Sequence, residues 1–541
     1  MSRPRPVAAL PALFALLAPP FGLSACSRTP PPAPEHVLLI VVDTLRADHL
    51  SAYGYPRPTS PALDELAAEG ILFRRAIAQS SWTSPSMVSM MTGRYLAEER
   101  LAVPESVPTL AETFQSQGWG TAAFVSNDIL SEENGFRRGF DEFVLMQPYD
   151  PDDPILDWIR GRAGKKTFTW VHLAEPHDPY MPPEGFLKYR KAPGEPGSEL
   201  LEYYRKVDAE LGLEDFDSSV ARIQEEIGGY DDDVAYCDRR IAALLGALEA
   251  SGQEDSTAVV IASDHGEGLW TRLAYHSGQR EAKRVAGEAP TLVNTLMPSH
   301  GNQVNRELVH VPLILRSPGL PKGRVVDSPV ENLDIPSTLV ELCRLEAPRG
   351  LQGKSLLAAL GRSRKDDVAF SHTRFASTLI TADGLQLIAP TPLGRCQEGL
   401  EIELYDLDSD PDARNDIAAE HVGRVHELLR EVERRLAKGI SGDMRQISNE
   451  NLIKLKGLGY IADGTVDAPR EDLAGMPFKE LALVIADHER SCLERLDAAR
   501  ALRGRVLDEE QRSNLGVLLQ RERAPAVRAE LQRLLDEAAA R

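Results

Sequence analysis

Short apolar runs alternate with amphipathic segments through most of the first 350 residues. The apolar runs are uniform over their whole length, which is typical of buried parallel strands; they lie at residues 37–42, 121–126, 167–173, 258–263 and 311–316. Segments with the apolar spacing of a helix, bounded by residues that start or stop helices, lie between or after these runs, at residues 61–70, 107–118, 230–248 and 334–342. We expect Asp334 to cap the last of them. The alternation predicts an α/β fold in which a largely parallel sheet is flanked by helices.

The pattern changes after residue 351, which we take as the end of a large domain over residues 36–351. Shorter strands at residues 385–388 and 403–407, followed by a helix near 422–438, predict a smaller C-terminal α+β domain over residues 352–462. Residues 463–541 are rich in Leu, Ala, Glu and Arg. They predict a helical tail of two or three helices.

One stretch, residues 79–94 (QSSWTSPSMVSMMTGR), combines a hydroxyl-rich turn with a short amphipathic helix. We expect this helix to begin at Pro85, because proline is well tolerated in a first turn. Thr83 then lies at the positive end of the helix, where an anionic group is held favourably. Taken alone, the stretch is better explained as a capped helix that has no chemistry, and the case for chemistry depends on the rest of the chain.

Acidic residues and a histidine follow two of the predicted strands. Asp43 comes directly after residues 37–42, and Asp264 and His265 come directly after residues 258–263. Because ligand-binding residues of open α/β sheets gather at the carboxyl ends of strands, we expect these side chains to meet. Carboxylates, an imidazole and the Thr83 hydroxyl suit a divalent metal ion. The simpler alternative is a helix-capping aspartate and a structural histidine.

The N-terminus predicts export. Arg3 and Arg5 precede an apolar run that ends at Leu23-Ser24-Ala25-Cys26, and small residues before a cysteine at this place resemble a bacterial lipobox. Residues 1–26 are then a lipoprotein signal, Cys26 is the lipidated residue, and residues 27–35 are a Pro-rich tether. We expect a periplasmic or cell-envelope lipoprotein held at a membrane by this anchor. An ordinary secretory signal with a chance cysteine is the alternative.

Charge excludes one class of partner. The 541 residues carry a formal net charge of -21, and contacts to a nucleic-acid backbone need clustered Lys and Arg. We therefore expect no nucleic-acid partner, and an anionic substrate would have to be attracted by a local site.

Six motifs occur together in an order and spacing that resemble the sulfatase family of the alkaline phosphatase superfamily, across residues 35–461. They are VVDTLRADHLSAYGY, SSWTSPSMVSMMTG, EPHDPY, SDHGEG, SHGNQVNRELVHVPLILR and ELYDLDSDPDARNDIA. The resemblance implies a metal-assisted ester hydrolase. By position it implies that Asp43, Asp264 and His265 are metal ligands, and that Thr83 is both the nucleophile and a further ligand.

The resemblance assigns roles to four further residues. His300 matches a position that binds substrate oxygen or serves as general acid. His177 and Asn127 match loop positions that contact the transferred group. Arg46 orients the nucleophile or neutralises substrate charge, with an ion pair as the alternative. His172 is expected to pack within its strand.

Two departures from the family pattern change the expected chemistry. Sulfatases that make formylglycine need Cys or Ser where this chain has Thr83, and Met87 stands where they have Arg. No formylglycine is therefore expected. Thr44 also stands where many sulfatases have a second Asp. A threonine nucleophile with a nearby Asn127 resembles instead the phosphodiesterase and phosphoethanolamine-transferase branches of the superfamily.

The sequence thus favours a phosphodiesterase-like hydrolase of a small-molecule, glycan-linked or lipid-linked ester. The mechanism would pass through a covalent Thr83 ester and use a divalent metal ion whose identity (Ca, Mn, Mg or Zn) is open. Three alternatives stay open: a sulfuric ester hydrolase without formylglycine, a head-group phosphotransferase, and a catalytically silent binding protein. Residues 269–299 look like an insertion that shapes access to the site.

Overall fold

The computed structural model describes residues 31–97, 102–273, 290–361, 367–391, 394, 400–440, 473, 475–487, 492–522 and 524–540. The predicted signal with Cys26, the tether up to residue 30, residues 274–289 of the insertion and the stretch 441–472 lie outside the described residues. Within the described part, no helix has the length and apolar character needed to cross a membrane.

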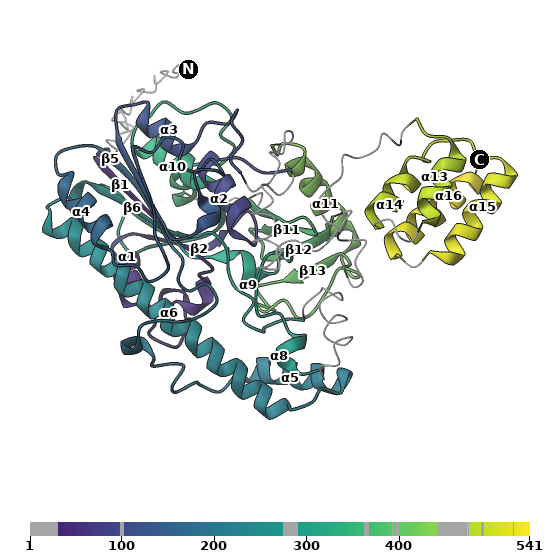
Figure 1. Ribbon diagram of the computed structural model, residues 1–541, viewed down its shortest axis with the longest axis horizontal. Coiled ribbons are helices and arrows are strands. Elements are labelled where there is room, and N and C mark those ends of the chain that lie inside the picture. Colours follow the sequence, from purple (N-terminus) through teal and green to yellow (C-terminus); the bar gives the residue numbers. More distant parts are fainter. Residues whose placement is uncertain are drawn as a thin grey trace, which may run out of the picture.

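A nine-stranded sheet forms the centre of the large domain (Figure 1). Its strands are β1 His36–Val42, β2 Ile71–Ile77, β3 Gly120–Val125, β4 Glu142–Leu145, β5 Thr167–Leu173, β6 Thr257–Ser263, β7 His310–Val311, β8 Leu313–Arg316 and β9 Arg324–Glu331. Their order is β4-β3-β5-β1-β6-β8-β2-β7, with β9 beside β2. The five strands from β4 to β6 are parallel, whereas β8 runs antiparallel to β6.

Helices cover both faces of this sheet, because its central strands are apolar on both sides. Along β1, Val37, Leu39 and Val41 enter one buried cluster, and the residues between them enter another. The first face packs against α2 (Thr83–Thr92), α3 (Leu110–Gln115) and α10 (Asp334–Leu342). The second packs against α1 (Pro61–Glu69), α4 (Asp153–Gly161) and the long α6 (Phe216–Ala250), as Figure 1 shows. Three further α-helices of the described part belong to this domain: α5 Ser198–Leu211, α8 Leu292–Thr295 and α9 Arg306–Val309.

Two further units follow the large domain. A four-stranded antiparallel sheet, in the order β10-β11-β12-β13, packs against α11 (Val422–Leu436). Its strands are β10 Val368–His372, β11 Ala376–Thr381, β12 Leu385–Pro390 and β13 Glu403–Asp406. The tail forms four helices around its own apolar core, α13 Phe478–Ala486, α14 Cys492–Arg500, α15 Glu509–Arg521 and α16 Pro525–Ala540. The predicted fold class is confirmed, although the predicted two or three tail helices were too few; the domain boundaries stay predictions.

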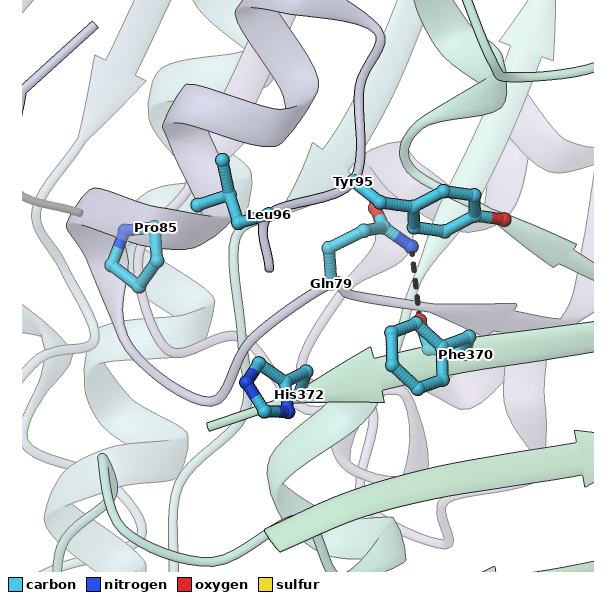
Figure 2. Close-up of a pocket in the computed structure, with 6 residues that line it drawn as sticks. All are labelled: Gln79, Pro85, Tyr95, Leu96, Phe370 and His372. Atoms are coloured by element: carbon cyan, nitrogen blue, oxygen red, sulfur yellow. Dashed lines mark hydrogen bonds between the residues drawn. The ribbon is translucent and has the colours of Figure 1, made fainter. Parts of the chain in front are cut away.

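The second sheet meets the turn that leads into α2. Figure 2 shows a small cavity at this seam, lined by Gln79, Pro85, Tyr95, Leu96, Phe370 and His372. The Gln79 side chain donates to the Phe370 carbonyl at 3.4 Å and accepts from the Leu333 backbone N–H at 2.8 Å. The His372 N–H donates to the Gln79 carbonyl at 2.9 Å. The second sheet therefore fixes the backbone that enters the Thr83 turn.

Three local predictions were wrong for physical reasons. Helix α2 begins at Thr83 rather than Pro85, with Trp82 as its extended cap residue. Asp334 lies inside its helix; its carboxylate accepts instead from the Glu331 and Lys354 backbone N–H groups. The single strand predicted at residues 311–316 is interrupted at Pro312, because proline has no N–H to give to the ladder.

Candidate active site

Strand ends bring three predicted metal ligands together. Asp43 follows β1 and Asp264 follows β6, and these neighbouring strands are in register, with Val42 opposite Ser263. One potential ligand atom from each of Asp43, Asp264 and His265 lies within 4.8 Å of the others, and all three residues are buried. The His265 Nε2 atom is 3.5 Å from Asp43 Oδ1 and 3.6 Å from Asp264 Oδ2.

The donor atoms of this cluster fit a divalent cation. Asp43 Oδ1 and Asp264 Oδ2 are buried and have no hydrogen-bond partner among the described residues. The His265 Nδ1 atom lies 2.9 Å from the Gly266 carbonyl, so this nitrogen carries the hydrogen and Nε2 presents its lone pair to the carboxylates. Buried carboxylate oxygens without donors are costly, and a bound cation would satisfy them.

Electrostatics support the same conclusion. Burial, and then the charge of Asp264, raise the pKa of Asp43. Burial opposes ionisation of Asp264 too, but His265 and His172 outweigh it and lower the pKa of Asp264. Burial lowers the pKa of the His265 imidazole, which keeps the ring neutral. A neutral imidazole and two close carboxylates are the state that a cation binds.

Thr83 lies beside this cluster, as predicted. Its Oγ1 atom is 3.2 Å from His265 Nε2, and the side chain is buried at the first residue of α2. Ser86, one turn further on, donates from its hydroxyl to the Asp264 carbonyl at 2.5 Å. The helix that carries Thr83 is thus bonded directly to the strand end that carries two of the predicted metal ligands.

The structure brings Asn127 to the cluster through Asp43. Its Nδ2 atom donates to Asp43 Oδ2 at 3.0 Å, and its Oδ1 atom accepts from the Ile129 N–H at 3.0 Å. The two bonds fix the orientation of the amide. The only Asp43 oxygen that faces the site without a hydrogen-bond donor among the described residues is therefore Oδ1.

His177 and His300 lie next to each other at the same site. The His300 ring centroid is 4.3 Å from that of His265 and 5.1 Å from that of His177. Burial, and then the charge of His177, lower the pKa of His300. Burial also disfavours the charged form of His177, but Asp43 and Glu267 outweigh this effect and raise its pKa. The two imidazoles therefore differ in their tendency to hold a proton.

Arg46 is buried at the edge of the site, and its guanidinium bonds to Asp48 and Glu267 rather than to Thr83. The guanidinium donates to both carboxylate oxygens of Asp48, at 2.8 and 2.7 Å, and to the Glu267 carbonyl at 3.0 Å. The ion pair that we considered as the alternative is present, but on a residue that is only 5 % exposed.

Two residues near the metal ligands received no functional role from the sequence. Glu267 accepts a hydrogen bond from His300 Nδ1, with 3.0 Å between the atoms. His172, expected to pack within β5, has its Nε2 atom 3.6 Å from Asp264 Oδ2, and both side chains are fully buried. The available signals were an acidic residue inside the SDHGEG motif and a polar residue in an otherwise apolar strand.

Comparisons with known proteins identify the family of the chain. The Sulfatase family model matches residues 35–344. The "Ulvan-active sulfatase" of Formosa agariphila is 24% identical over 392 residues, which cover 65% of this chain and 70% of that protein.

Two solved structures share the fold. One is a protein in complex with its substrate D-glucosamine-2-N,6-O-disulfate; it has a TM-score of 0.59 and 19% identity and covers 75% of this chain and 98% of its own. The phosphonate monoester hydrolase of Agrobacterium radiobacter has a TM-score of 0.57 and 18% identity, with 75% and 96% covered. With the family model matching more than half of the chain, this protein belongs to the sulfatase family and is a hydrolase of the alkaline phosphatase superfamily.

Proposed function

We propose that this sulfatase-family protein hydrolyses phosphodiesters through a covalent ester on Thr83, with one divalent metal ion held by Asp43, Asp264, His265 and Thr83. The observation that carries the proposal is the position of Thr83 Oγ1, buried at the start of α2 and 3.2 Å from His265 Nε2. Threonine cannot be converted to the family's aldehyde. The hydroxyl itself must therefore be the nucleophile.

The charges at the site support a substrate with a single negative charge. Met87, which replaces the family's Arg, is buried in the apolar core below α2. Arg46 is paired with Asp48. The described residues around Thr83 therefore offer histidines but no unpaired guanidinium to balance the second charge of a phosphate monoester. A phosphodiester or a sulfate ester carries only one charge.

Each residue of the site has a separate role in an in-line displacement. The Thr83 hydroxyl first releases its proton to solvent. Attack by the resulting alkoxide forms the bond from Thr83 Oγ1 to phosphorus and breaks the bond to the leaving oxygen, which takes a proton from His300. Asn127 orients Asp43, and His177 donates to an oxygen of the transferred group. A divalent cation, when bound, would lower the pKa of the Thr83 hydroxyl and neutralise charge on the transferred group. Water then hydrolyses the Thr83 ester, and His300 recovers its proton.

A panel of esters tests the substrate class. Purified, metal-loaded protein is given 4-nitrophenyl sulfate, 4-nitrophenyl phosphate and bis(4-nitrophenyl) phosphate. We expect the highest kcat/KM for the diester and the lowest for the phosphate monoester. The second candidate function, sulfate ester hydrolysis, is favoured by the name of the ulvan-active relative. Turnover of the sulfate without the diester would replace our proposal with it.

A pair of variants tests the nucleophile. Thr83→Ala removes the hydroxyl, and we expect a loss of at least about 10⁴-fold in kcat, comparable to removing other covalent nucleophiles. Thr83→Ser keeps the hydroxyl and retains measurable turnover. Bound metal, measured by elemental analysis, should persist in both because three ligands remain. Equal rates in Thr83→Ala and the parent protein would remove Thr83 from the mechanism.

A further inference from the structure

We infer that Glu267 is a positioning residue for the reaction: its carboxylate holds the His300 imidazole so that proton transfer to the leaving oxygen takes place at Nε2. Glu267 Oε1 lies 3.0 Å from His300 Nδ1, and the two side chains are 1% and 3% exposed. The inference rests on the proposed function, in which His300 supplies a proton. The sequence motifs assigned no role to Glu267.

The bond between Glu267 and His300 is built into the backbone. The segment after Glu267 pairs with the segment before His300: the Leu269 N–H donates to the Pro298 carbonyl at 3.0 Å, and the Trp270 N–H to the Met297 carbonyl at 2.8 Å. These backbone contacts alone bring Glu267 beside His300, independently of the bond between the two side chains.

Glycines on either side of Glu267 allow the close approach. A Cβ atom on Gly268 would lie 2.5 Å from the Ser299 carbonyl oxygen, and one on Gly266 would lie 2.0 Å from the Glu307 carbonyl oxygen. Both contacts involve backbone, which cannot move aside cheaply. The turn is therefore packed directly against the residue that precedes His300, and the carboxylate is held at a fixed position.

Arg46 and Gly268 hold the same turn from two sides. Arg46 Nη1 donates to the Glu267 carbonyl at 3.0 Å, and the Gly268 N–H donates to Glu267 Oε1 at 3.1 Å. The second bond orients the oxygen that faces His300. Arg46 thereby contributes to the site by fixing the turn, although its guanidinium bonds to Asp48 and Glu267 rather than to the nucleophile.

The carboxylate determines which ring nitrogen of His300 is available for chemistry. When Nδ1–H donates to Glu267, proton exchange with a substrate falls to Nε2. Oε2 of Glu267 is buried without a hydrogen-bond partner among the described residues. A carboxylate kept there only for packing would be costly, which supports a role in positioning His300.

The experiment compares two substrates that differ only in the leaving group, a 4-nitrophenyl ester and an alkyl ester, in the ester class that the parent protein hydrolyses. A 4-nitrophenolate leaves without protonation, whereas an alkoxide needs a proton. We expect Glu267→Ala to lower kcat for the alkyl ester by about 10²-fold or more, and for the 4-nitrophenyl ester by less than about 5-fold. His300→Asn should show the same pattern, and the double variant should be no slower than His300→Asn alone.

Glu307→Gln is the matched control. Glu307 is another buried carboxylate of this region, but it pairs with Arg272 at 2.8 Å rather than with His300. Its substitution should change both substrates by the same factor. An equal loss on both substrates in Glu267→Ala, or fully additive losses in the double variant, would overturn the positioning role.

A spectroscopic measurement separates this inference from the proposed function. In protein labelled with ¹⁵N-histidine, a carboxylate-bound Nδ1–H gives a downfield proton resonance. It should disappear in both Glu267→Ala and His300→Asn and persist in Glu307→Gln. Persistence in Glu267→Ala would contradict the inference. A parent protein that hydrolyses none of the esters but shows this resonance pattern would contradict the proposed function and leave the Glu267–His300 pair intact.

Discussion

Two clusters of buried aspartates in this molecule differ in how their oxygens are satisfied. On α6, Asp231 accepts from the Tyr55 hydroxyl at 2.7 Å and from the Arg57 guanidinium at 2.6 Å. Its neighbour Asp232 accepts three backbone N–H bonds from residues 188–190, at 2.7 to 2.9 Å. At the strand ends, by contrast, Asp43 Oδ1 and Asp264 Oδ2 have no hydrogen-bond partner among the described residues.

The difference separates carboxylates that stabilise the fold from carboxylates that keep one oxygen available for a ligand. Burial alone does not distinguish them, because Asp231, Asp232 and Asp264 are all fully buried. A buried carboxylate costs free energy unless donors or a cation surround it. The α6 cluster finds its donors in three surface loops and so ties these loops to the helix. In the strand-end cluster one oxygen of each carboxylate has no donor among the described residues, and this lack is what points to a metal.

Removal of the metal gives the largest expected effect. Treatment with a chelator should abolish turnover, because the Thr83 hydroxyl loses the charge that lowers its pKa. Adding a divalent cation back at about a thousand times its Kd should restore turnover and stabilise the fold by about 4 kcal/mol. Thermal unfolding with and without metal measures the shift.

Asp264→Asn is the control for metal removal, and it should show neither the metal-dependent shift nor turnover. Full activity of the chelated protein, verified as metal-free by elemental analysis, would contradict the metal site. It would also remove the contrast between the two clusters.

Asp232→Ala gives the next largest effect, on stability rather than chemistry. Loss of the carboxylate leaves the N–H groups of Lys188, Tyr189 and Arg190 without their acceptor, and we expect a loss of about 4 kcal/mol in the free energy of unfolding. Urea unfolding of the metal-free protein measures it. Glu225→Ala, an exposed site on the same helix, should change stability by less than about 0.5 kcal/mol. Similar values for both variants would show that the Asp232 bonds do not hold the loop.

Asp233→Asn tests the comparison through the pH dependence of stability. Burial, only partly offset by the Tyr149 hydroxyl, raises the pKa of Asp233 from 3.8 to about 8. The folded state therefore holds a proton that the unfolded state has released, and its stability falls as pH rises from 3.8 towards 8. The variant has no carboxyl group to titrate at this position. Its free energy of unfolding, relative to that of the parent protein, should therefore rise by about 3 kcal/mol between pH 5 and pH 7. Urea unfolding at both pH values checks the difference. If the difference in stability does not change with pH, Asp233 has the hydrogen-bond donors that a buried carboxylate needs, like its neighbours Asp231 and Asp232.

The sequence predicts well what depends on one strand or one motif. Asp43, Asp264 and His265 could be expected at one edge of the sheet because parallel strands end together, and Thr83 could be placed near them only through the motifs that its turn shares with a family. The start of α2 at Thr83 was missed because Pro85 is the stronger local signal.

Contacts between distant segments could not be predicted from the sequence. The bond from Glu267 to His300 depends on the pairing of residues 269–270 with residues 297–298, which no local pattern encodes. Likewise Asp334 has the residue type of a helix cap, but it is the first residue of α10, where its carboxylate accepts from the nearby Glu331 N–H and from the more distant Lys354 N–H. Polar residues in buried positions are thus the places where sequence patterns and the structure differ.

Asp43→Asn gives the smallest expected effect on stability, and its sign is the most informative. In the metal-free protein, burial and the neighbouring Asp264 raise the pKa of Asp43, so at neutral pH its ionised form destabilises the folded state. An uncharged amide removes that repulsion, keeps an acceptor for Asn127, and can donate to Asp264. We expect the metal-free variant to be more stable than the metal-free parent by about 1 kcal/mol. With saturating metal the order should reverse, because the parent gains a ligand that the variant lacks. Urea unfolding in both states measures the two differences. A variant that is destabilised in both would mean that Asp43 belongs with the structural aspartates of α6, and that the strand-end cluster is held together by its own side chains rather than by a cation.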